Sequence, residues 1–317
     1  MSVKGSTFCT ILTRNYLPFA AVLFQSLVKT NSAVQLQVLV ADAENKQDLY
    51  FPSSQLTYHD KTSILTSDIA KSIYKKYAAT NNDQLRWSLK PVFILHLLQS
   101  GFEKVIYVDP DVYFTGDYRF LFEELNKYDI LLSPHWSIVD PLKHEDGLYS
   151  ILRNGLYSGC FVGSTKNGTN GLQWWAEACH YKVEKVKELG LYDDQKYLDV
   201  LPLINEKTGL IRHPGCNITN INIDSCKREL VNGQMMINHI FHPIFIHFTK
   251  DTIINIRNGN DRLLQPYLNE YTSALKNAGA DLMMGTDVPS TFFYKIKRNL
   301  LLRTRLKRFF FKLVEKL

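Results

Sequence analysis

Residues Lys104 to Thr115 read KVIYVDPDVYFT, and this stretch decides the fold class. Val105 to Val108 is a short run of β-branched, aliphatic and aromatic residues, typical of a strand that is buried on both faces. The run ends abruptly in Asp109, Pro110 and Asp111. Both carboxylates therefore follow the carboxyl end of a strand, which is the edge of an open α/β sheet where ligands bind.

The spacing of the two acids indicates a chemistry. In extended chain, side chains at i and i+2 project to the same side, so Asp109 and Asp111 can face one hard cation. Such a cation takes oxygen ligands and commonly completes its shell with substrate phosphates. For an isolated Asp-x-Asp, however, a pair of solvated acids in a turn is the commoner explanation. The surrounding sequence has to decide between the two.

The chain opens with a βαβ unit. Thr7 to Leu12 predicts a strand, Phe19 to Lys29 has the periodicity of a helix, and Leu36 to Ala41 predicts a second strand. The polar turn Thr13 to Pro18 joins the first strand to the helix. This order implies a parallel sheet with a right-handed crossover, the usual opening of a nucleotide-binding α/β domain.

Further elements follow the same pattern of apolar runs and turn signals. Pro91 suits the first turn of a helix, where its missing N–H is harmless, and Gly101 suits the stop of that helix. The segment Pro134 to Tyr149 is long, polar and aromatic, and we interpret it as an acceptor-side lid. We expect helices over 67–79, 91–99, 118–127, 172–186, 194–201 and 263–277, and strands over 130–133, 157–163 and 244–248.

Length and composition are those of a globular protein. With 317 residues, 45% of them hydrophobic, the chain can bury a full core as one large domain with an appendage. Its five cysteines include no C-x-x-C pair, so we interpret them as reduced thiols of a cytosolic protein. The first residues lack the pattern of a secretory signal, and no run of eighteen or so apolar residues predicts a spanning helix.

The positive charge is concentrated at the C-terminal end. Residues 289–317 carry nine Lys or Arg and one acid, a formal charge of +8, whereas the first 288 residues sum to −2. Apolar residues between Ile296 and Leu317 recur at spacings of one to four, which predicts a basic amphipathic helix. Such helices lie in the headgroup plane of an anionic membrane. The alternatives are a dimerisation helix and a nucleic-acid-binding arm, and the run Phe309 to Phe311 favours lipid.

The order of these motifs resembles the GT-A nucleotide-sugar glycosyltransferases. The resemblance is closest to glycosyltransferase family eight, the glycogenin and lipopolysaccharide galactosyltransferase group, and it spans roughly Ser6 to Asp251. It implies a GT-A, Rossmann-like fold with a mixed, mainly parallel sheet flanked by helices. The motifs that carry it are TRNY (13–16), LKP (89–91), VIYVDPDV (105–112), YSGCFVG (157–163), WW (174–175), YDDQKYLD (192–199), RHPGCN (212–217) and FIHF (245–248).

The resemblance implies a metal site. Asp109, Asp111 and His247 take the positions of the family's ligands to Mn²⁺ or Mg²⁺, which bridges the diphosphate of a UDP-sugar. His247 is otherwise a satisfied core histidine at a strand end. The family holds the diphosphate with residues that this chain lacks, since it has Thr249, Lys250 and Asp251 at those positions. We expect Lys250 or Lys90 to contact the diphosphate instead, and Lys90 is the preferred candidate. The alternative for Lys90 is a solvated lysine at a helix start.

The turn after the first strand matches the segment that receives uracil and ribose. Asn15 and Tyr16 coincide with the family's Asn-Tyr, and the tyrosine supplies a stacking face for a base or simply covers the sheet. Thr10 and Thr13 are predicted to bind the nucleotide with them. Arg14 stands where the family often has an acid, which leaves the choice of base open.

Two further residues match the sugar side of the family's site. Asp194 is expected to bind sugar hydroxyls, and Gln195 to stabilise an oxocarbenium-like centre. Asp193 and Asp194 also suit an acidic helix N-terminus. Tyr157 replaces a common Asn, and His213 is either structural or close to the acceptor.

We therefore predict a catalytic domain over 1–260, a helical extension over 261–288 and a membrane-associating tail over 289–317. The expected activity is metal-dependent sugar transfer from a UDP-sugar to a hydroxyl of a lipid-linked or surface glycan, such as lipopolysaccharide or capsule. If the family is followed, configuration is retained. The expected location is cytoplasmic, on the inner face of the cytoplasmic membrane, without nucleic acid as partner. Alternatives are a catalytically silent scaffold and a nucleotidyltransferase, although the glycine-free turn 13–18 disfavours the latter.

Overall fold

The computed structural model describes residues 4–45, 54–79, 81–137, 140, 142, 145–186 and 189–282. One compact unit spans Met1–Ala280 and contains every described helix and strand, and Asp281–Leu317 forms a second unit. The predicted amphipathic helix of 289–317 lies outside the described residues. Within the described ranges, no helix has both the length and the hydropathy needed to cross a bilayer.

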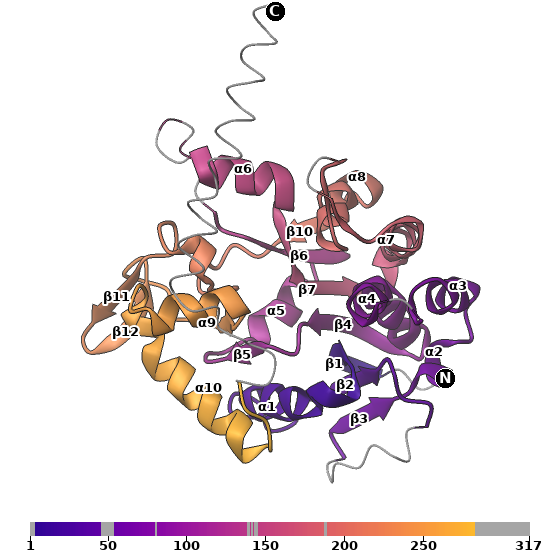
Figure 1. Cartoon of the computed structure of the whole chain (residues 1–317), viewed down its shortest axis with the longest axis horizontal. Coiled ribbons are helices and arrows are strands. Elements are labelled where there is room, and N and C mark those ends of the chain that lie inside the picture. Colours follow the sequence, from indigo (N-terminus) through magenta and orange to yellow (C-terminus); the bar gives the residue numbers. More distant parts are fainter. Residues whose placement is uncertain are drawn as a thin grey trace, which may run out of the picture. The chain divides into compact units, whose positions relative to one another are not determined.

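The helices and strands alternate along most of the chain (Figure 1). The α-helices are α1 (Leu17–Val28), α2 (Lys61–Ile64), α3 (Asp68–Tyr77), α4 (Asn82–Gln99), α5 (Arg119–Glu124), α6 (Glu145–Asn154), α7 (Thr169–Tyr181), α8 (Leu201–Ile204), α9 (Lys250–Arg257) and α10 (Gln265–Asn277). The strands are β1 (Lys4–Leu12), β2 (Leu36–Val40), β3 (Leu56–His59), β4 (Phe102–Val108), β5 (Val112–Phe114), β6 (Ile130–Pro134), β7 (Tyr157–Thr165), β8 (Lys185–Val186), β9 (Leu191–Tyr192), β10 (Thr208–Leu210), β11 (Arg228–Val231), β12 (Gln234–Ile237) and β13 (Phe245–His247). Short 3-10 helices include η1 (Arg14–Tyr16), η5 (Gln195–Val200), η6 (Asn220–Asn222) and η7 (Arg262–Leu264).

Seven strands form one central sheet in the order β10-β6-β7-β4-β1-β2-β3. Every neighbouring pair is parallel except those that include β7, which runs antiparallel to both β4 and β6. The predicted βαβ opening is confirmed, because β1 and β2 pair in parallel with Phe8 opposite Leu36. The predicted mixed, mainly parallel GT-A-like sheet is also confirmed.

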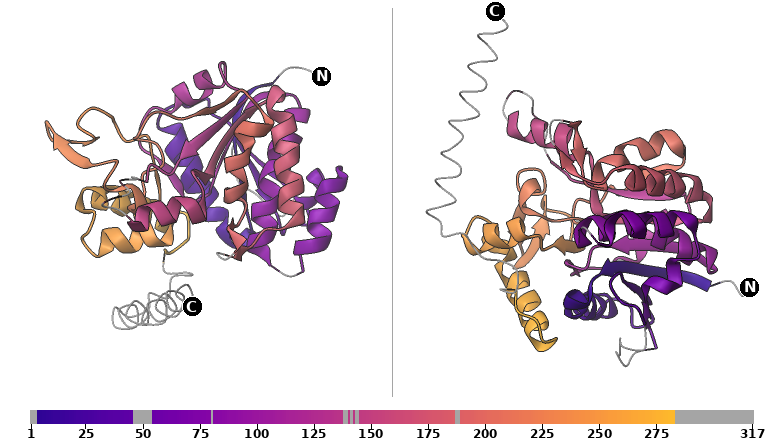
Figure 2. Two further views of the ribbon diagram at one scale, coloured as in Figure 1. Left: turned by 90° about the horizontal axis from the view of Figure 1, so that it is seen from above. Right: turned by 45° about the vertical axis from the view of Figure 1, so that its right-hand side comes forward.

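Helices cover both faces of this sheet (Figure 2). The side chains of Cys9, Val105 and Tyr107 pack into one core cluster with α3, α4 and α7. The alternate residues Phe8 and Ile106 pack into a second cluster with α1, β5 and α5. Because the central strands are buried on both sides, they are almost continuously apolar, and functional groups are confined to the ends of the strands.

The helix predicted over 91–99 is longer than expected. It begins at Asn82, where the Asn81 side chain accepts hydrogen bonds from the backbone N–H groups of Asp83 and Gln84. Pro91 therefore lies inside α4 and not in its first turn, and Lys90 is an interior residue of the helix, buried and not solvated. Packing of α4 against α3, α7 and β4 offsets the roughly 3 kcal/mol that an interior proline costs.

Two other predicted helices end or begin differently. The helix predicted over 172–186 ends at Tyr181, and Lys185 and Val186 form the short strand β8. The helix predicted over 194–201 is the 3-10 helix η5, and Pro202 does not stop it but lies in the first turn of α8. Part of the predicted lid 134–149 is helical, because α6 begins at Glu145.

The proposed helical extension begins with η7 and α10, which lie in the same compact unit as the sheet. In α10, the Tyr271 ring stacks on Phe248 at 4.4 Å, and Glu270 pairs with Lys29 of α1. The domain boundaries at 260 and 288 stay predictions.

We expect Asn81→Ala to lower the free energy of unfolding by about 1 kcal/mol, because two N–H groups in the first turn of α4 lose their acceptor. Chemical denaturation would measure the change. Asn81→Asp is the control, since aspartate caps equally well, and equal losses in both variants would contradict the capping role.

Candidate active site

Two short strands place the predicted metal ligands next to one another. Asp109 and Asp111 lie between β4 and β5, and His247 ends β13, which pairs antiparallel with β5 so that His247 is opposite Val112. Backbone hydrogen bonds fix the loop: Asp109 N–H donates to the carbonyl of Cys160, and Phe248 N–H donates to that of Asp111. The sheet edge thus brings together residues separated by more than a hundred positions.

The three side chains converge within the described part of the chain. One ligand atom from each of Asp109, Asp111 and His247 lies within 4.8 Å of the others. His247 Nε2 is 3.1 Å from Asp111 Oδ1 and 3.9 Å from Asp109 Oδ2. Burial alone would lower the pKa of His247, but the Asp111 carboxylate raises it well above its usual value. Two carboxylates and one imidazole suit a divalent cation such as Mn²⁺.

Lys90 is the electrostatic centre of the site. From the interior of α4, its Nζ lies 3.2 Å from Asp109 Oδ1 and 3.2 Å from Asp194 Oδ2, and it donates to the carbonyl of Gly159 at 2.9 Å. Only 4% of the residue is exposed. Burial would lower the pKa of Lys90, but Asp109 and Asp194 raise it well above the usual value, so the lysine stays charged.

Asp194 is buried and held by its backbone. Its carbonyl accepts a hydrogen bond from the indole Nε1 of Trp175 at 3.0 Å. Its Oδ2 makes the ion pair with Lys90 but no hydrogen bond within the described residues. Burial raises the pKa of Asp194 to about 7, the charges of Asp193 and Asp109 raise it as well, and Lys90 opposes the shift.

Gln195 connects two elements that border the site. Its Oε1 accepts from the N–H of Gly159 at 3.0 Å, and its Nε2 donates to the carbonyl of Asn154 at 2.8 Å. The amide therefore ties β7 to the end of α6. Because Gly159 also accepts from Lys90, this one glycine joins Lys90 and Gln195 through its backbone.

Asp193 and Lys185 form an outer ion pair. Asp193 has a left-handed backbone with φ of +44°, and its Oδ2 lies 3.2 Å from Lys185 Nζ. The ammonium of Lys185 also lies 4.8 Å from the ring centre of Trp87 and 4.9 Å from that of Tyr192. Three acids, Asp193, Asp194 and Asp109, are thus paired with two lysines, Lys185 and Lys90.

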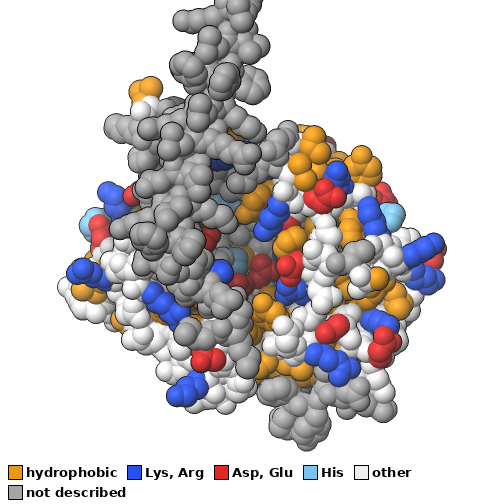
Figure 3. All heavy atoms as spheres, in the orientation of Figure 1, with side chains coloured by type: hydrophobic (Ala, Val, Ile, Leu, Met, Phe, Trp, Pro, Cys, Tyr) orange, Lys and Arg blue, Asp and Glu red, His pale blue; other side chains and the backbone are white. Residues whose placement is uncertain are grey.

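One cavity of about 410 Å³ is lined by most of these residues, including Asp109 and His247, whereas Asp111 is outside its lining. Figure 3 shows acidic, basic and histidine side chains gathered near the centre of one face. The lining includes six of the residues predicted from sequence, namely Lys90, Asp109, Asp194, Gln195, His247 and Lys250. Lys250 is exposed at the start of α9. The size suits a small-molecule ligand.

The turn predicted to bind the nucleotide base lies outside this lining. Thr10 is fully buried, and Thr13 Oγ1 donates to Asn15 Oδ1 at 2.6 Å. The Tyr16 ring lies 5.0 Å from that of Phe19 and 5.1 Å from the guanidinium of Arg86. The nucleotide-binding roles of Thr10, Thr13, Asn15 and Tyr16 stay predictions.

Several cavity residues were missed from sequence. His135 follows β6, and burial together with the charge of His247 lowers its pKa to about 4. The sequence predicts Gly159 only as a residue of a strand, although a glycine inside a strand often marks a place where another group comes close to the backbone. Trp87 and Lys185 carried no pattern that points to a site.

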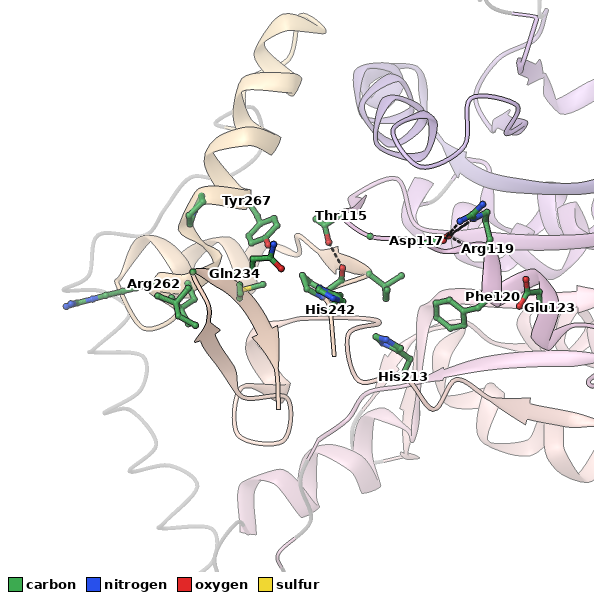
Figure 4. A pocket seen from close by; sticks show the side chains of 18 residues that line it. Thr115, Asp117, Arg119, Phe120, Glu123, His213, Gln234, His242, Arg262 and Tyr267 are labelled. Atoms are coloured by element: carbon green, nitrogen blue, oxygen red, sulfur yellow. Dashed lines mark hydrogen bonds and ion pairs between the residues drawn. The ribbon is translucent and has the colours of Figure 1, made fainter. Parts of the chain in front are cut away.

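A larger cavity of about 1190 Å³ has a lining that shares no residue with the first (Figure 4). His213 belongs here. Its ring lies 5.4 Å from Phe120 and 5.1 Å from Phe241, and its Nδ1 accepts from the N–H of Gly215 at 3.1 Å. These contacts support the structural alternative for His213.

Residues 8–129 match the model of Glycosyl transferase family 8. In fold, the chain is similar to the galactosyltransferase LgtC, solved in complex with donor and acceptor sugar analogs, with a TM-score of 0.51 and 14% identity over 91% of this chain and 99% of LgtC. The chain therefore has a GT-A-like fold, and its first 129 residues include a region similar to glycosyltransferase family 8.

The chain also has two relatives in Bacillus subtilis (strain 168). YfnF, an uncharacterized protein, is 26% identical over 258 residues, which cover 79% of this chain and 83% of YfnF. YfnD, also uncharacterized, is 24% identical over 260 residues, 80% of each chain. Both alignments extend far beyond the region that the family model matches.

We expect Gly159→Ala to reduce sugar transfer by the glycosyltransferase at least tenfold. A Cβ at this position would lie 3.3 Å from Asp194 Oδ2, so this carboxylate must move by a few tenths of an ångström, and it would contact Lys90 Nζ at 3.4 Å. Steady-state kinetics would measure the loss. Gly5→Ala is the control, because nothing lies within 4 Å of its Cβ. Equal activity in both variants would contradict the tight packing at Gly159.

We expect stability to depend on pH through His135. Its pKa of about 4 in the folded state lies below the usual value of about 6.5, so the unfolded chain takes up the proton first. The free energy of unfolding should therefore fall between about pH 6.5 and pH 4, by at most about 3 kcal/mol. Urea denaturation of the wild type and His135→Gln at pH 7.5 and pH 5 would measure it. The same pH slope in both proteins would exclude His135 as the cause.

Proposed function

We propose that this glycosyltransferase uses a divalent cation, Mn²⁺ or Mg²⁺, to transfer a sugar from a nucleotide-sugar, a UDP-sugar by preference, to a hydroxyl of a glycan acceptor. The observation that carries the proposal is the convergence of Asp109, Asp111 and His247 at a cavity that Asp109, His247, Lys90 and Asp194 line. Metal ligands and a buried carboxylate in one pocket are what a diphosphate-linked sugar requires.

Asp109, Asp111 and His247 would hold the cation, which when bound neutralises charge on the diphosphate leaving group. Lys90 holds Asp109 in place from the protein side, and its three N–H donors face Asp109, Asp194 and the Gly159 carbonyl. A direct phosphate contact would require Lys90 to leave one of these partners. Lys250, exposed at the cavity, is therefore the better candidate for the diphosphate.

Asp194 and Gln195 would face the sugar. Asp194 Oδ2 has the Lys90 ion pair as its contact and no hydrogen bond among the described residues, so it can accept from a sugar hydroxyl. Gln195 Oε1 accepts one hydrogen bond, from Gly159, and a carbonyl oxygen has a second lone pair. That lone pair is a fixed dipole for positive charge that develops at the anomeric carbon. Retention of configuration is part of the same proposal.

The acceptor and the location belong to this proposal as well. We infer a lipid-linked saccharide or growing surface glycan, such as lipopolysaccharide or capsule, at the cytoplasmic face of the membrane. The support is the sequence of residues 289–317, where nine cations alternate with Leu and Phe.

The alternative in another class is a catalytically silent scaffold that binds nucleotide-sugars. The buried Lys90–Asp194 pair disfavours it, because buried charged groups with strongly shifted pKa values cluster at sites that carry out chemistry. A scaffold would tolerate loss of Asp111, and an enzyme would not.

The test is a thermal-shift and UDP-release assay with a panel of nucleotide-sugars, with and without Mn²⁺. We expect one UDP-sugar to raise the melting temperature only when Mn²⁺ is present, and at a hundred times its Kd to add about 2.7 kcal/mol of stability. Asp111→Asn should abolish the shift and the release of UDP.

Asp117→Asn is the matched control, since Asp117 is half exposed and pairs with Arg119 outside this cavity. It should bind donor and release UDP as the wild type does. If no nucleotide-sugar stabilises the protein with metal present, the assignment fails.

A further inference from the structure

Three successive carbonyls beside the cavity are held by side chains from a single distant segment. Asn217 Nδ2 donates to the carbonyl of Pro134 at 3.1 Å, Asn222 Nδ2 donates to that of His135 at 3.2 Å, and Ser225 Oγ donates to that of Trp136. Trp136 has a left-handed backbone with φ of +55°, which is rare for so large a side chain. Local sequence does not favour this conformation, so the side-chain contacts must maintain it.

Asn222 is the centre of this brace. Its Nδ2 donates to the carbonyls of His135 and Asn217, and its Oδ1 accepts from the N–H of Thr219 at 3.1 Å and from Arg228 Nη2 at 3.1 Å. The residue is 1% exposed. All four hydrogen-bonding positions of the amide are used, so neither a smaller nor a charged side chain can replace it without loss.

Arg228 holds the segment that contains Thr219, Asn222 and Cys226. Its Nη1 donates to the carbonyls of Asn222 and Cys226, and its Nη2 donates to the carbonyl of Thr219 and to Asn222 Oδ1. Its Nε lies 3.1 Å from Asp261 Oδ2, and both side chains are almost completely buried. A rigid planar fork with several donors is what arginine supplies and lysine does not.

Both of the braced segments line the candidate catalytic cavity. His135 and Ser137 come from one, and Thr219, Asn220 and Ile221 come from the other. The second segment is also bonded to the strand of the metal ligand, because His247 N–H donates to the carbonyl of Ile218 at 3.0 Å. A displacement of the brace would therefore move the cavity wall next to His247.

We propose that Asn222 and Arg228 are positioning residues of the active site: they hold residues 135–137 and 219–221 as a fixed cavity wall. They touch no reacting group, and they act through the carbonyls that they bind. The expected effect on kcat rests on the proposed function, whereas the expected effect on the position of the cavity wall does not.

Asn222→Asp tests the proposal. The carboxylate still accepts from Thr219 and Arg228, but it has no N–H for the carbonyls of His135 and Asn217 and faces both with a negative charge. We expect hydrogen exchange of the amides of residues 135–137 to accelerate at least tenfold and kcat for sugar transfer to fall at least tenfold. Affinity for Mn²⁺ alone should change less than twofold.

Asn205→Asp is the matched control. Asn205 is also buried, and its Nδ2 donates to Asn170 Oδ1 at 3.1 Å, but it does not line the cavity. The control should lose similar thermal stability yet keep kcat and the exchange of residues 135–137. Equal kcat losses in both variants would reduce Asn222 to a structural role and overturn the proposal.

Arg228→Lys provides a second variant that keeps the charge toward Asp261. It should accelerate exchange of residues 219–221 and lower kcat with little change in donor KM. Unchanged exchange of both wall segments in both variants would also overturn the proposal. If the wild type transfers no sugar, the proposed function fails, and the exchange measurements alone decide whether the wall is braced.

Discussion

The arrangement of the site depends on one buried ammonium group. Lys90 lies in the interior of a helix with almost no access to water, and it remains charged because Asp109 and Asp194 face it from two different strand ends. Removing the lysine would leave Asp194 as a buried carboxylate without its cation, which costs several kcal/mol. The ion pairs therefore tie α4 to the loop after β4 and to the start of η5.

Chain topology supplies this charge arrangement. Because β7 runs antiparallel to β4, its first residues lie at the carboxyl end of β4, and the carbonyl and N–H of Gly159 reach Lys90 and Gln195 there. Because β13 pairs with β5, His247 lies beside Asp111. The antiparallel pairs β4–β7 and β5–β13 thus bring Gly159 and His247 to the site, which parallel strands alone would not do.

The sequence predicts those parts of the fold and of the site in which a run of residues is long enough to show a pattern. The βαβ opening, the central strand and the convergence of Asp109, Asp111 and His247 follow from apolar runs and motif order. The strands β5, β8, β9, β11 and β12 have two to four residues, too few for an alternating pattern to be distinguished from chance. The start of α4 was predicted too late, because a proline is favoured in the first turn of a helix, whereas tertiary packing accommodates Pro91 in the interior of α4. Contacts such as Asn222 to His135 join residues 87 positions apart, and no local rule relates them.

The direction of β7 has a consequence for how such enzymes diversify. The segment between the end of β6 and the start of β7 leaves the sheet and returns to it at the same edge, because the two strands are antiparallel neighbours. Its length is therefore not constrained by a crossover, unlike that of a connection between parallel strands. Insertions and deletions in α6 can accumulate there while Lys90, Asp109 and His247 keep their places. Because Ser150, Ile151 and Asn154 of α6 line the cavity, such changes would reshape one of its borders without altering the elements that place these three groups.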